Sequence, residues 1–323
     1  MEECYRENCS LMGATIGFVI VSHDKPAQLL RLVRRLMKLY NNPPIVCHHD
    51  FSQCSLEGFD FPSEVTFVRP HIDTKWGGMG VVFGSLAALR VMYQRADSPE
   101  WFVLLSSTDY PVRPARASLD QLASGGFDAY LDHRLVEYPW TPDPCVQYAP
   151  HAFNSAGWVP LAYDRYIAVQ LWLPWYSWTR RKSIKIPVGK IRSKLLVGPF
   201  NPFSETLKCY GGSTWFTGNR KVAERLLARN AENRKVLAHY SRRFIPDESH
   251  WHTILCNQPD LKISKDSLRY IDWSLSGHHP KTLGMEDIPG ILASGAHFAR
   301  KFDLAKGAEV FDAIDAAVDA ASR

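Results

Sequence analysis

Apolar and polar residues in the first 130 positions alternate between short apolar runs and longer amphipathic segments. Two segments, 26–40 and 80–95, repeat apolar residues at helical spacing, and Pro26 stands where a helix can begin. Strands that alternate with helices of this length predict an α/β fold with a mostly parallel, wound sheet, whose ligands bind beyond the carboxyl ends of the strands. The apolar runs that have the length of buried strands are 16–22, 45–48, 65–69 and 101–106.

The second half of the chain returns to this pattern only after a long interruption. Residues 138–200 hold five tryptophans and several tyrosines and prolines. These aromatic side chains suit the sugar faces of a carbohydrate or lipid-linked acceptor, or they pack on the main domain, and both interpretations stay open. Beyond the interruption we expect a strand at 213–217, a helix from Arg220 to about Ala228, and a final helix over 303–321.

No internal repeat or low-complexity linker divides the chain, so a single domain is expected. We assign residues 14–305 to this domain, with 138–200 as a variable insertion on the acceptor side. In this scheme residues 1–13 are an N-terminal extension and residues 306–323 are a C-terminal helix.

The composition is that of a folded protein, because 46% of the 323 residues are hydrophobic and 22% are charged. No apolar run approaches the roughly 18 residues of a membrane span. The first residues lack a basic region followed by an apolar one, and the seven cysteines are scattered. A cytoplasmic enzyme is therefore expected.

Positive charge gathers in one segment, although the formal net charge is only +5. Residues 180–194 include seven basic side chains and no acidic one. This segment suits a solvated loop, contact with an anionic substrate, or peripheral contact with an acidic membrane surface. No nucleic-acid-binding motif accompanies it, so a nucleic-acid partner is not expected.

Polar residues cluster directly after the predicted strands. Because parallel strands end at the same edge of a sheet, such clusters predict a binding crevice there. The clusters are His23-Asp24, His49-Asp50, Asp73–Gly78 and Ser106–Tyr110.

Several familiar motifs are absent from the sequence, including the dinucleotide glycine motif, the P-loop, Cys-x-x-Cys and Gly-x-Ser-x-Gly. The segment Cys47–Asp50 alternates faces on a strand and lacks further ligands, so no metal site is expected. No two aspartates stand two residues apart, and a nucleotide diphosphate would have to be neutralised by lysine or arginine. The candidates are Arg269, Lys281, Arg300 and Lys301.

Two carboxylates, Asp247 and Glu248, follow Pro246 at the start of an aromatic, histidine-rich segment. Acidic residues in a first helical turn can simply offset the helix dipole. A carboxylate held on a rigid element can instead act as a catalytic base. The segment alone does not decide between these two roles.

Seven segments occur in the order of the signature blocks of one family. They are WGGMG (76–80), LLSSTDYPVR (104–113), GGSTWFTGNRK (211–221), IPDESHWHTIL (245–255), LRYIDW (268–273), HPKTL (279–283) and HFARKFD (297–303). Over residues 14 to 305 the chain resembles the core-2/I-branching β-1,6-N-acetylglucosaminyltransferases and, more closely, the peptide O-xylosyltransferases. Residues 138–200 show no such match.

The resemblance implies a GT-A type nucleotide-sugar fold, an inverting single displacement and no divalent metal. It makes Glu248 the general base that takes the proton of the acceptor hydroxyl, with Asp247 on the substrate side. It also makes Lys301, beside Arg300, the group that meets the diphosphate of the donor.

The resemblance assigns further residues to the donor and the acceptor. A second cation is expected upstream of Lys301, and Arg269 is preferred to Lys281. Asp109 can alternatively cap a helix, and Trp215 can alternatively belong to the core. The residues expected at uridine and ribose are Val21, His23 and Asp50. The residues expected at the donor–acceptor crevice and the sugar pocket are Trp76, Gly77, Gly78, Asp109, Tyr110 and Trp215.

Animal members of this family are Golgi membrane proteins with an anchor, a stem and disulfides, which the sequence does not show. A cytoplasmic enzyme is expected, with a UDP-sugar as donor and a glycan, a glycoside or a lipid-linked sugar as acceptor. Xylose, N-acetylglucosamine and glucuronic acid are all compatible as the transferred sugar. Two alternatives stay open: a binding protein that kept the fold and lost turnover, and a metal-dependent hydrolase using His23, His49 and Asp50.

Overall fold

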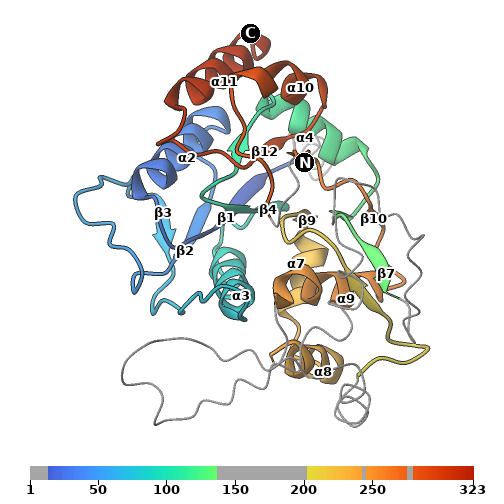
Figure 1. Cartoon of the computed structure of the whole chain (residues 1–323). Coiled ribbons are helices and arrows are strands. Elements are labelled where there is room, and N and C mark those ends of the chain that lie inside the picture. Colours follow the sequence, from blue (N-terminus) through green and yellow to red (C-terminus); the bar gives the residue numbers. More distant parts are fainter. Residues whose placement is uncertain (1–13, 137–201, 242–244, 275–278) are drawn as a thin grey trace, which may run out of the picture.

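The computed structural model describes residues 14–136, 202–241, 245–274 and 279–323. The expected N-terminal extension, the insertion at 138–200 and its basic segment lie outside the described residues. The described part is an α/β arrangement in which helices cover both faces of a central sheet (Figure 1).

The central sheet has seven strands in the order β10-β6-β9-β4-β1-β2-β3. Its parallel half consists of β1 (Ile16–Ser22), β2 (Ile45–His49), β3 (Val65–Phe67) and β4 (Trp101–Ser106). The other half consists of β6 (Ala129–Tyr130), β9 (Thr217–Asn219) and β10 (Ile263–Ser264). Strand β9 runs antiparallel to both β4 and β6, whereas β10 runs parallel to β6. The sheet is therefore rich in parallel pairs, as predicted, with one reversed strand.

Two smaller sheets extend this framework. The first has the order β11-β12-β5 and consists of β11 (Arg269–Ile271), β12 (Phe298–Arg300) and β5 (Tyr110–Pro111). Strand β12 is parallel to β11 and antiparallel to β5. The second pairs β7 (Arg134–Val136) with β8 (Cys209–Gly211). The three-stranded sheet joins segments near the C-terminus to the loop that follows β4.

The helices lie in two groups, one on each side of the central sheet (Figure 1). One group contains α2 (Pro26–Leu39), α4 (Ala115–Ser124), α10 (Ile288–Ala293) and α11 (Ala308–Ala321). The other contains α3 (Gly80–Tyr93), α7 (Arg220–Leu227), α8 (Ala231–Tyr240) and α9 (His250–Cys256). Two short 3₁₀ helices, η4 (Pro246–Glu248) and η5 (Met285–Asp287), precede α9 and α10.

Each face of the sheet buries its own apolar core, because neighbouring side chains of a strand point to opposite faces. In β1, Phe18 and Ile20 enter the core that contains α2 and α11. Val19 and Val21 enter the core that contains α3 and α9. Burial on both faces explains why the sequence of β1 is an unbroken apolar run.

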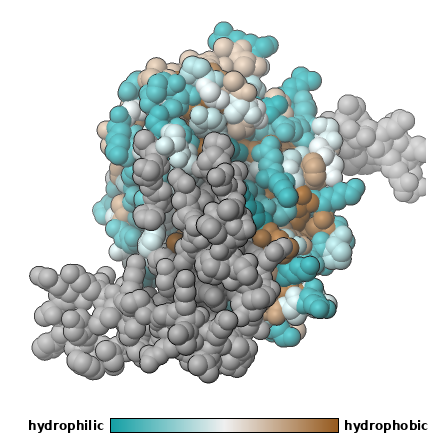
Figure 2. Space-filling model, turned by 45° about the vertical axis from the view of Figure 1, so that its right-hand side comes forward, coloured by the Kyte–Doolittle hydropathy of each residue, from teal (hydrophilic) through white to brown (hydrophobic). Residues whose placement is uncertain are grey.

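The surface differs from these cores in composition. On the face shown in Figure 2, the described surface is mostly hydrophilic and its hydrophobic side chains gather in one area. Within the described ranges, no helix combines the length and apolar character needed to cross a membrane.

The predicted elements of the first half match the structure closely. The strands predicted at 16–22 and 101–106 have those bounds, and the helices predicted at 26–40 and 80–95 end one and two residues earlier. The strand predicted at 213–217 is wrong, because most of this segment is a loop between β8 and β9. That loop lines the site described below.

The final helix begins at Ala308 and not at residue 303. Asp303 instead forms an ion pair with Lys25 at 3.0 Å, which holds the preceding turn against the start of α2. Helices α4 and α8 have no counterpart among the predicted elements.

Opposite charges join α2 to α11. Arg35, whose side chain is 4% exposed, lies 2.9 Å from Asp315 and 2.7 Å from Asp319. Asp315 also lies 3.1 Å from Arg31 and accepts a hydrogen bond from the Tyr110 hydroxyl at 3.0 Å. These contacts hold the C-terminal helix against α2 and β5.

Replacing Asp315 by alanine should lower the free energy of unfolding by about 2–3 kcal/mol, because the nearly buried Arg35 loses a charged partner. The control is Asp312→Ala, which removes a carboxylate that is 72% exposed and lies 2.6 Å from Arg31. This control should cost less than about 1 kcal/mol. Urea denaturation measures both values, and equal losses would contradict the role assigned to Asp315.

Candidate active site

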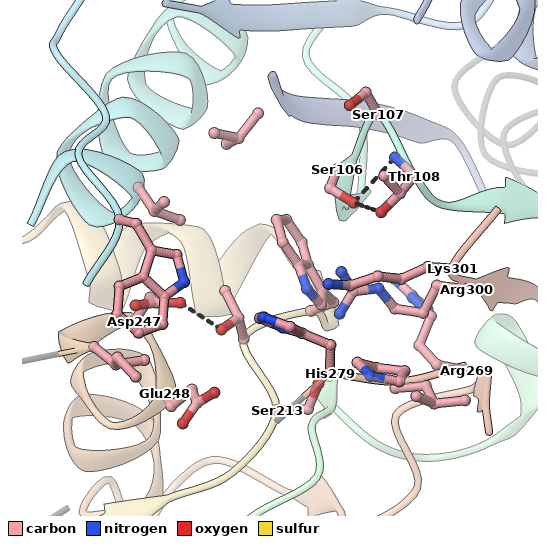
Figure 3. A pocket seen from close by; sticks show the side chains of 18 of the residues that line it. Ser106, Ser107, Thr108, Ser213, Asp247, Glu248, Arg269, His279, Arg300 and Lys301 are labelled. Atoms are coloured by element: carbon pink, nitrogen blue, oxygen red, sulfur yellow. Dashed lines mark hydrogen bonds between the residues drawn. The ribbon is translucent and has the colours of Figure 1, made fainter. Parts of the chain in front are cut away.

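A cavity of about 760 Å³ opens beyond the carboxyl ends of β1 and β4, where the crevice was predicted. Residues from both halves of the chain line it, and Figure 3 shows part of the lining. The predicted site residues that line the cavity are Val21, His23, Trp76, Gly77, Trp215, Asp247, Glu248, Arg269, Arg300 and Lys301. The predicted site residues that do not line it are Asp50, Gly78, Asp109, Tyr110 and Lys281.

Three cations, Arg269, Arg300 and Lys301, lie together on one side of the cavity (Figure 3). Arg269 begins β11, Arg300 ends the neighbouring strand β12, and Lys301 follows it. Burial and the charge of Arg300 lower the pKa of Lys301 to about 8, and burial lowers the pKa of Arg269 to about 10. Several positive charges held close together with little water favour a bound anion.

Of the two candidates for the upstream cation, Arg269 is the one at the cavity. Its guanidinium stacks on the Phe298 ring at 4.8 Å. Lys281 forms ion pairs with Glu286 at 3.0 Å and Asp287 at 2.7 Å and does not line the cavity.

Asp247 and Glu248 face the cavity across from the cations (Figure 3). Both belong to η4, and the N-cap residue of the following helix α9 is Ser249, with no side-chain capping hydrogen bond. The Thr214 hydroxyl donates to Asp247 at 2.8 Å, and the Gly212 amide donates to the backbone carbonyl of Glu248 at 2.8 Å. The Asp247 carboxylate and the backbone of Glu248 are therefore tied to the loop before β9, and both residues line the cavity.

Three tryptophans line the cavity, Trp76, Trp215 and Trp273, and the first two differ in exposure. Trp215 is half-buried, and the Arg300 guanidinium stacks on its ring at 4.9 Å. Trp76 is 69% exposed and lies in the loop between β3 and α3. The apolar run that suggested a strand at 213–217 thus includes Trp215, whose ring packs on Arg300. The spacing of hydrophobic residues in the sequence cannot predict such a contact.

Asp50 lies behind the cavity wall. Its carboxylate accepts hydrogen bonds from Ser52 at 2.6 Å, Gln53 at 2.6 Å and the Thr74 amide at 2.6 Å. Burial by itself would raise the pKa of this carboxyl, but these hydrogen bonds outweigh burial and hold the pKa well below its usual value. Asp50 itself does not line the cavity, but Gln53 and Thr74 do. Asp50 therefore acts on the cavity by holding two of its lining residues in place.

Asp109 and Tyr110 are likewise behind the wall. The Asp109 side chain is fully buried, and Tyr110 is 1% exposed among aromatic residues of the core. Gly78 is next to the lining residue Gly77.

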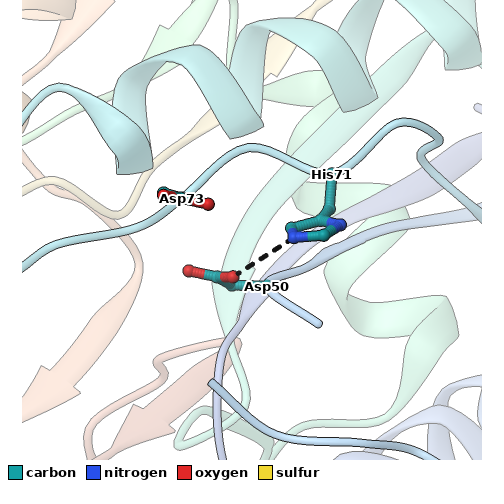
Figure 4. Close-up of side chains that lie close together, drawn as sticks. All are labelled: Asp50, His71 and Asp73. Atoms are coloured by element: carbon teal, nitrogen blue, oxygen red, sulfur yellow. Dashed lines mark ion pairs between the residues drawn. The ribbon is translucent and has the colours of Figure 1, made fainter. Parts of the chain in front are cut away.

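Among the residues that the structure describes, Asp50, His71 and Asp73 bring three candidate metal ligands within 4.8 Å of one another (Figure 4). His71 lies 3.8 Å from Asp50. Both carboxylate oxygens of Asp50 already accept hydrogen bonds, one from Ser52 and the other from Thr74. A metal ion would have to displace these donors, so this group fits a hydrogen-bonded anchor better than a cation site.

The ligand set considered for a metal-dependent hydrolase is also occupied by other contacts. The two ring nitrogens of His49 contact the Ser22 hydroxyl at 2.9 Å and the Cys54 carbonyl at 2.8 Å. His49 is fully buried and does not line the cavity.

Millimolar Mg²⁺, Mn²⁺ or Zn²⁺ should therefore change the melting temperature of the protein by less than about 1 °C, since a ligand stabilises only the state that binds it. Differential scanning fluorimetry in EDTA and in each metal measures this shift. A saturable rise that the Asp73→Asn variant abolishes would contradict our interpretation of the Asp50 cluster.

Several lining residues were not predicted for the site. Trp273 and His279 stand inside the ordered blocks, and this membership was the signal that could have found them. In Figure 3, His279 lies between Asp247 and Arg300. Asp132 and Arg134 follow the two-residue strand β6, which is too short for a periodic pattern. Burial raises the pKa of the Asp132 carboxyl.

Comparisons with known proteins match the chain to one family model and to several relatives. A model of the Core-2/I-Branching enzyme family matches residues 175–291. The chain is 23% identical to Beta-glucuronosyltransferase GlcAT14B of Arabidopsis thaliana over 93% of this chain and 65% of that protein. It is 25% identical to Beta-glucuronosyltransferase GlcAT14A of the same plant, over 84% of this chain and 58% of that protein.

A third relative is Xylosyltransferase 1 of Mus musculus, which is 24% identical over 93% of this chain and 30% of its own length. The chain thus spans less than two thirds of the length of each of these relatives. The matching family and the relatives are glycosyltransferases. The resemblance inferred from the ordered blocks is confirmed: the chain is related to the core-2/I-branching enzymes and to the xylosyltransferases.

Proposed function

We propose that this chain is a GT-A type glycosyltransferase that moves a sugar from a UDP-sugar to an acceptor hydroxyl, with inversion and without a divalent metal. The observation that supports this proposal most is the arrangement of charge in one cavity. The carboxylate of Glu248 lies on one side, and the cations Arg300 and Lys301 lie on the other. A reaction that removes a proton at one end and releases an anion at the other needs this separation.

In the proposed reaction, the acceptor hydroxyl enters beside Glu248, which takes its proton. The acceptor oxygen forms a bond to the anomeric carbon as the bond from that carbon to the β-phosphate oxygen breaks. The electron pair of the broken bond stays on UDP, whose diphosphate Lys301 and Arg300 stabilise as its charge develops. Attack from the face opposite the leaving group inverts the anomeric carbon in one step.

The ends of the cavity suit the two substrates differently. We propose that the uridine lies toward Val21, His23 and Gln53, at the ends of β1 and β2. Trp76 offers an exposed indole face to the sugar ring of an acceptor, which we propose to be a glycan, a glycoside or a lipid-linked sugar. The names of the relatives favour glucuronic acid or xylose as the transferred sugar, with N-acetylglucosamine as the third candidate. The pathway would be glycan or polysaccharide biosynthesis.

Glu248→Gln should lower the turnover number by about 10²–10⁴-fold, because the amide has no basic oxygen for the acceptor proton. UDP release from UDP-glucuronic acid, UDP-xylose and UDP-N-acetylglucosamine, in EDTA and with a mixture of glycan acceptors, measures this loss. The control is Glu57→Gln, an exposed carboxylate that does not line the cavity. Unchanged turnover in Glu248→Gln would contradict the assignment of the base, and UDP binding without turnover in wild type would favour the binding-protein alternative.

The affinity for UDP should fall about tenfold between pH 7 and pH 9, through Lys301. In the free protein the pKa of Lys301 is lowered to about 8, so the side chain is protonated at pH 7 and mostly neutral at pH 9. Because the diphosphate binds the protonated form, affinity is lost as the pH rises through this pKa. Lys301→Arg keeps its charge over this range and should remove most of the dependence.

Isothermal titration calorimetry with UDP across this pH range, in EDTA, measures the dependence in both proteins. The same slope in wild type and in Lys301→Arg would contradict the contact between Lys301 and the diphosphate.

A further inference from the structure

We propose that Asp109 is a positioning residue, which orients Arg300 against Trp215 and provides the counter-charge of the cation cluster without touching either substrate. This inference rests on the proposed function, in which that cluster holds the diphosphate. It replaces the direct substrate contact that the sequence suggested for Asp109.

The Asp109 carboxylate is fixed before any ligand arrives. Its side chain is fully buried between β4 and β5 and does not line the cavity. One oxygen, Oδ2, accepts hydrogen bonds from the Ser106 amide at 2.7 Å and from the Ser106 hydroxyl. A carboxylate held in this way by its own turn cannot rotate freely to follow a substrate, and it offers its second oxygen in one direction.

That direction is toward Arg300. The antiparallel pairing of β5 with β12 sets Ala299 opposite Tyr110, so Arg300 comes opposite Asp109 at the next position. The free oxygen of Asp109, Oδ1, lies 3.4 Å from Nε of Arg300. The backbone pairing of two strands thus determines which cation the carboxylate meets.

The pair is close but not fully hydrogen-bonded. Both Oδ1 of Asp109 and Nε of Arg300 are buried and have no hydrogen-bond partner among the described residues. A structural ion pair optimised for stability would close to about 2.7–2.9 Å. Buried polar atoms that face each other without closing call for a functional explanation. Here the explanation is that the guanidinium is shared between Asp109 and the anion expected in the cavity.

Arg300 is held on a second side by an aromatic ring. Its guanidinium stacks on the Trp215 ring at 4.9 Å. Trp215 therefore contacts the face of this planar group, and Asp109 lies at its Nε edge. Arg300 lines the cavity in this orientation. A group fixed at both face and edge loses little conformational entropy when an anion binds.

Asp109 also balances the charge of the whole cluster. Burial lowers the pKa of Arg269, Arg300 and Lys301, and the negative charge of Asp109 opposes that effect for each of them. The charge of Arg300 lowers the pKa of Lys301 further. One buried carboxylate therefore supports three neighbouring positive charges.

The test compares UDP binding by the wild-type chain, Asp109→Asn and Asp128→Asn, by calorimetry from pH 6 to pH 9 in EDTA. Asp128 is the control, because its carboxylate also accepts two hydrogen bonds, one from the Asn219 side chain at a partly buried position and one from the Lys262 amide at an exposed one, and it does not line the cavity. Asp109→Asn should weaken UDP binding about tenfold near neutral pH. It should also move the midpoint of the pH dependence below that of wild type, because Lys301 loses a supporting negative charge.

A purely structural role for Asp109 predicts a different result. Both variants would then lose stability, measured by urea denaturation, and the pH midpoint of Asp109→Asn would stay at the wild-type value. That outcome would overturn the inference while leaving the proposed function intact. Absence of UDP binding by the wild-type chain would overturn the proposed function, and the role of Asp109 with it.

Two further variants keep the test decisive. At pH 6.5, where Lys301 is protonated, adding Asp109→Asn to Arg300→Gln should weaken UDP binding less than twofold, because the effect acts through Arg300. Fully additive losses would overturn the inference. Where Asp109→Asn does not fold, Asp109→Glu should keep the pH midpoint and weaken UDP binding several-fold, because the charge stays and the position shifts. Unchanged affinity of Asp109→Glu would overturn the positioning role.

Discussion

The constraint on which the rest of the structure depends is the burial of three positive charges at one side of a cavity. Arg269, Arg300 and Lys301 repel one another, and burial removes much of the water that would screen them. Such an arrangement persists only if the surrounding fold holds each charge in place and supplies compensating groups. Asp109, the rings of Trp215 and Phe298, and the carboxylates across the cavity provide that compensation. We propose that an anionic ligand supplies the compensation that the protein itself lacks.

The fold brings these charges together from distant parts of the chain. Strand β4 of the central sheet is followed by a loop that leads to β5. Because β5 pairs with β12, and β12 with β11, the three-stranded sheet places Arg269 and Arg300 near that loop. Gln28, at the start of α2, donates hydrogen bonds to the carbonyls of Ser107 at 2.8 Å and Phe302 at 3.0 Å. The contacts between α2 and α11 then fix the C-terminal helix behind the same site. The helix contacts far from the cavity are in this way part of the support for its charges.

Much of this architecture could be predicted from the sequence, and the reasons are physical. Strands β1 and β4 are buried on both faces, so their apolar runs mark their bounds, and α2 shows a clear apolar face. The ordered blocks placed Glu248 and Lys301 in one site, and the cavity contains both. Strands β5, β11 and β12 have two or three residues each, and such lengths carry no periodic signal.

The errors have a common origin in contacts between distant segments. Trp215 was placed in a strand because its neighbours are apolar, but its ring packs on Arg300. Asp50 and Asp109 stand in polar clusters at strand ends, where a crevice was predicted, and the family resemblance assigned both of them to the substrates. Each of them instead contacts other protein residues. Asp50 accepts hydrogen bonds from Gln53 and Thr74, and Asp109 lies beside Arg300. Which polar group touches a ligand and which supports it depends on partners far away in the sequence.

The central claim is that protein cations neutralise the nucleotide diphosphate, and a crystal structure of the chain with UDP and Mn²⁺ present together tests it most directly. We predict that the diphosphate oxygens lie within hydrogen-bond distance of Lys301 and Arg300, with no metal between them and the protein. A Mn²⁺ ion that bridges the diphosphate and a carboxylate of the chain would contradict the claim.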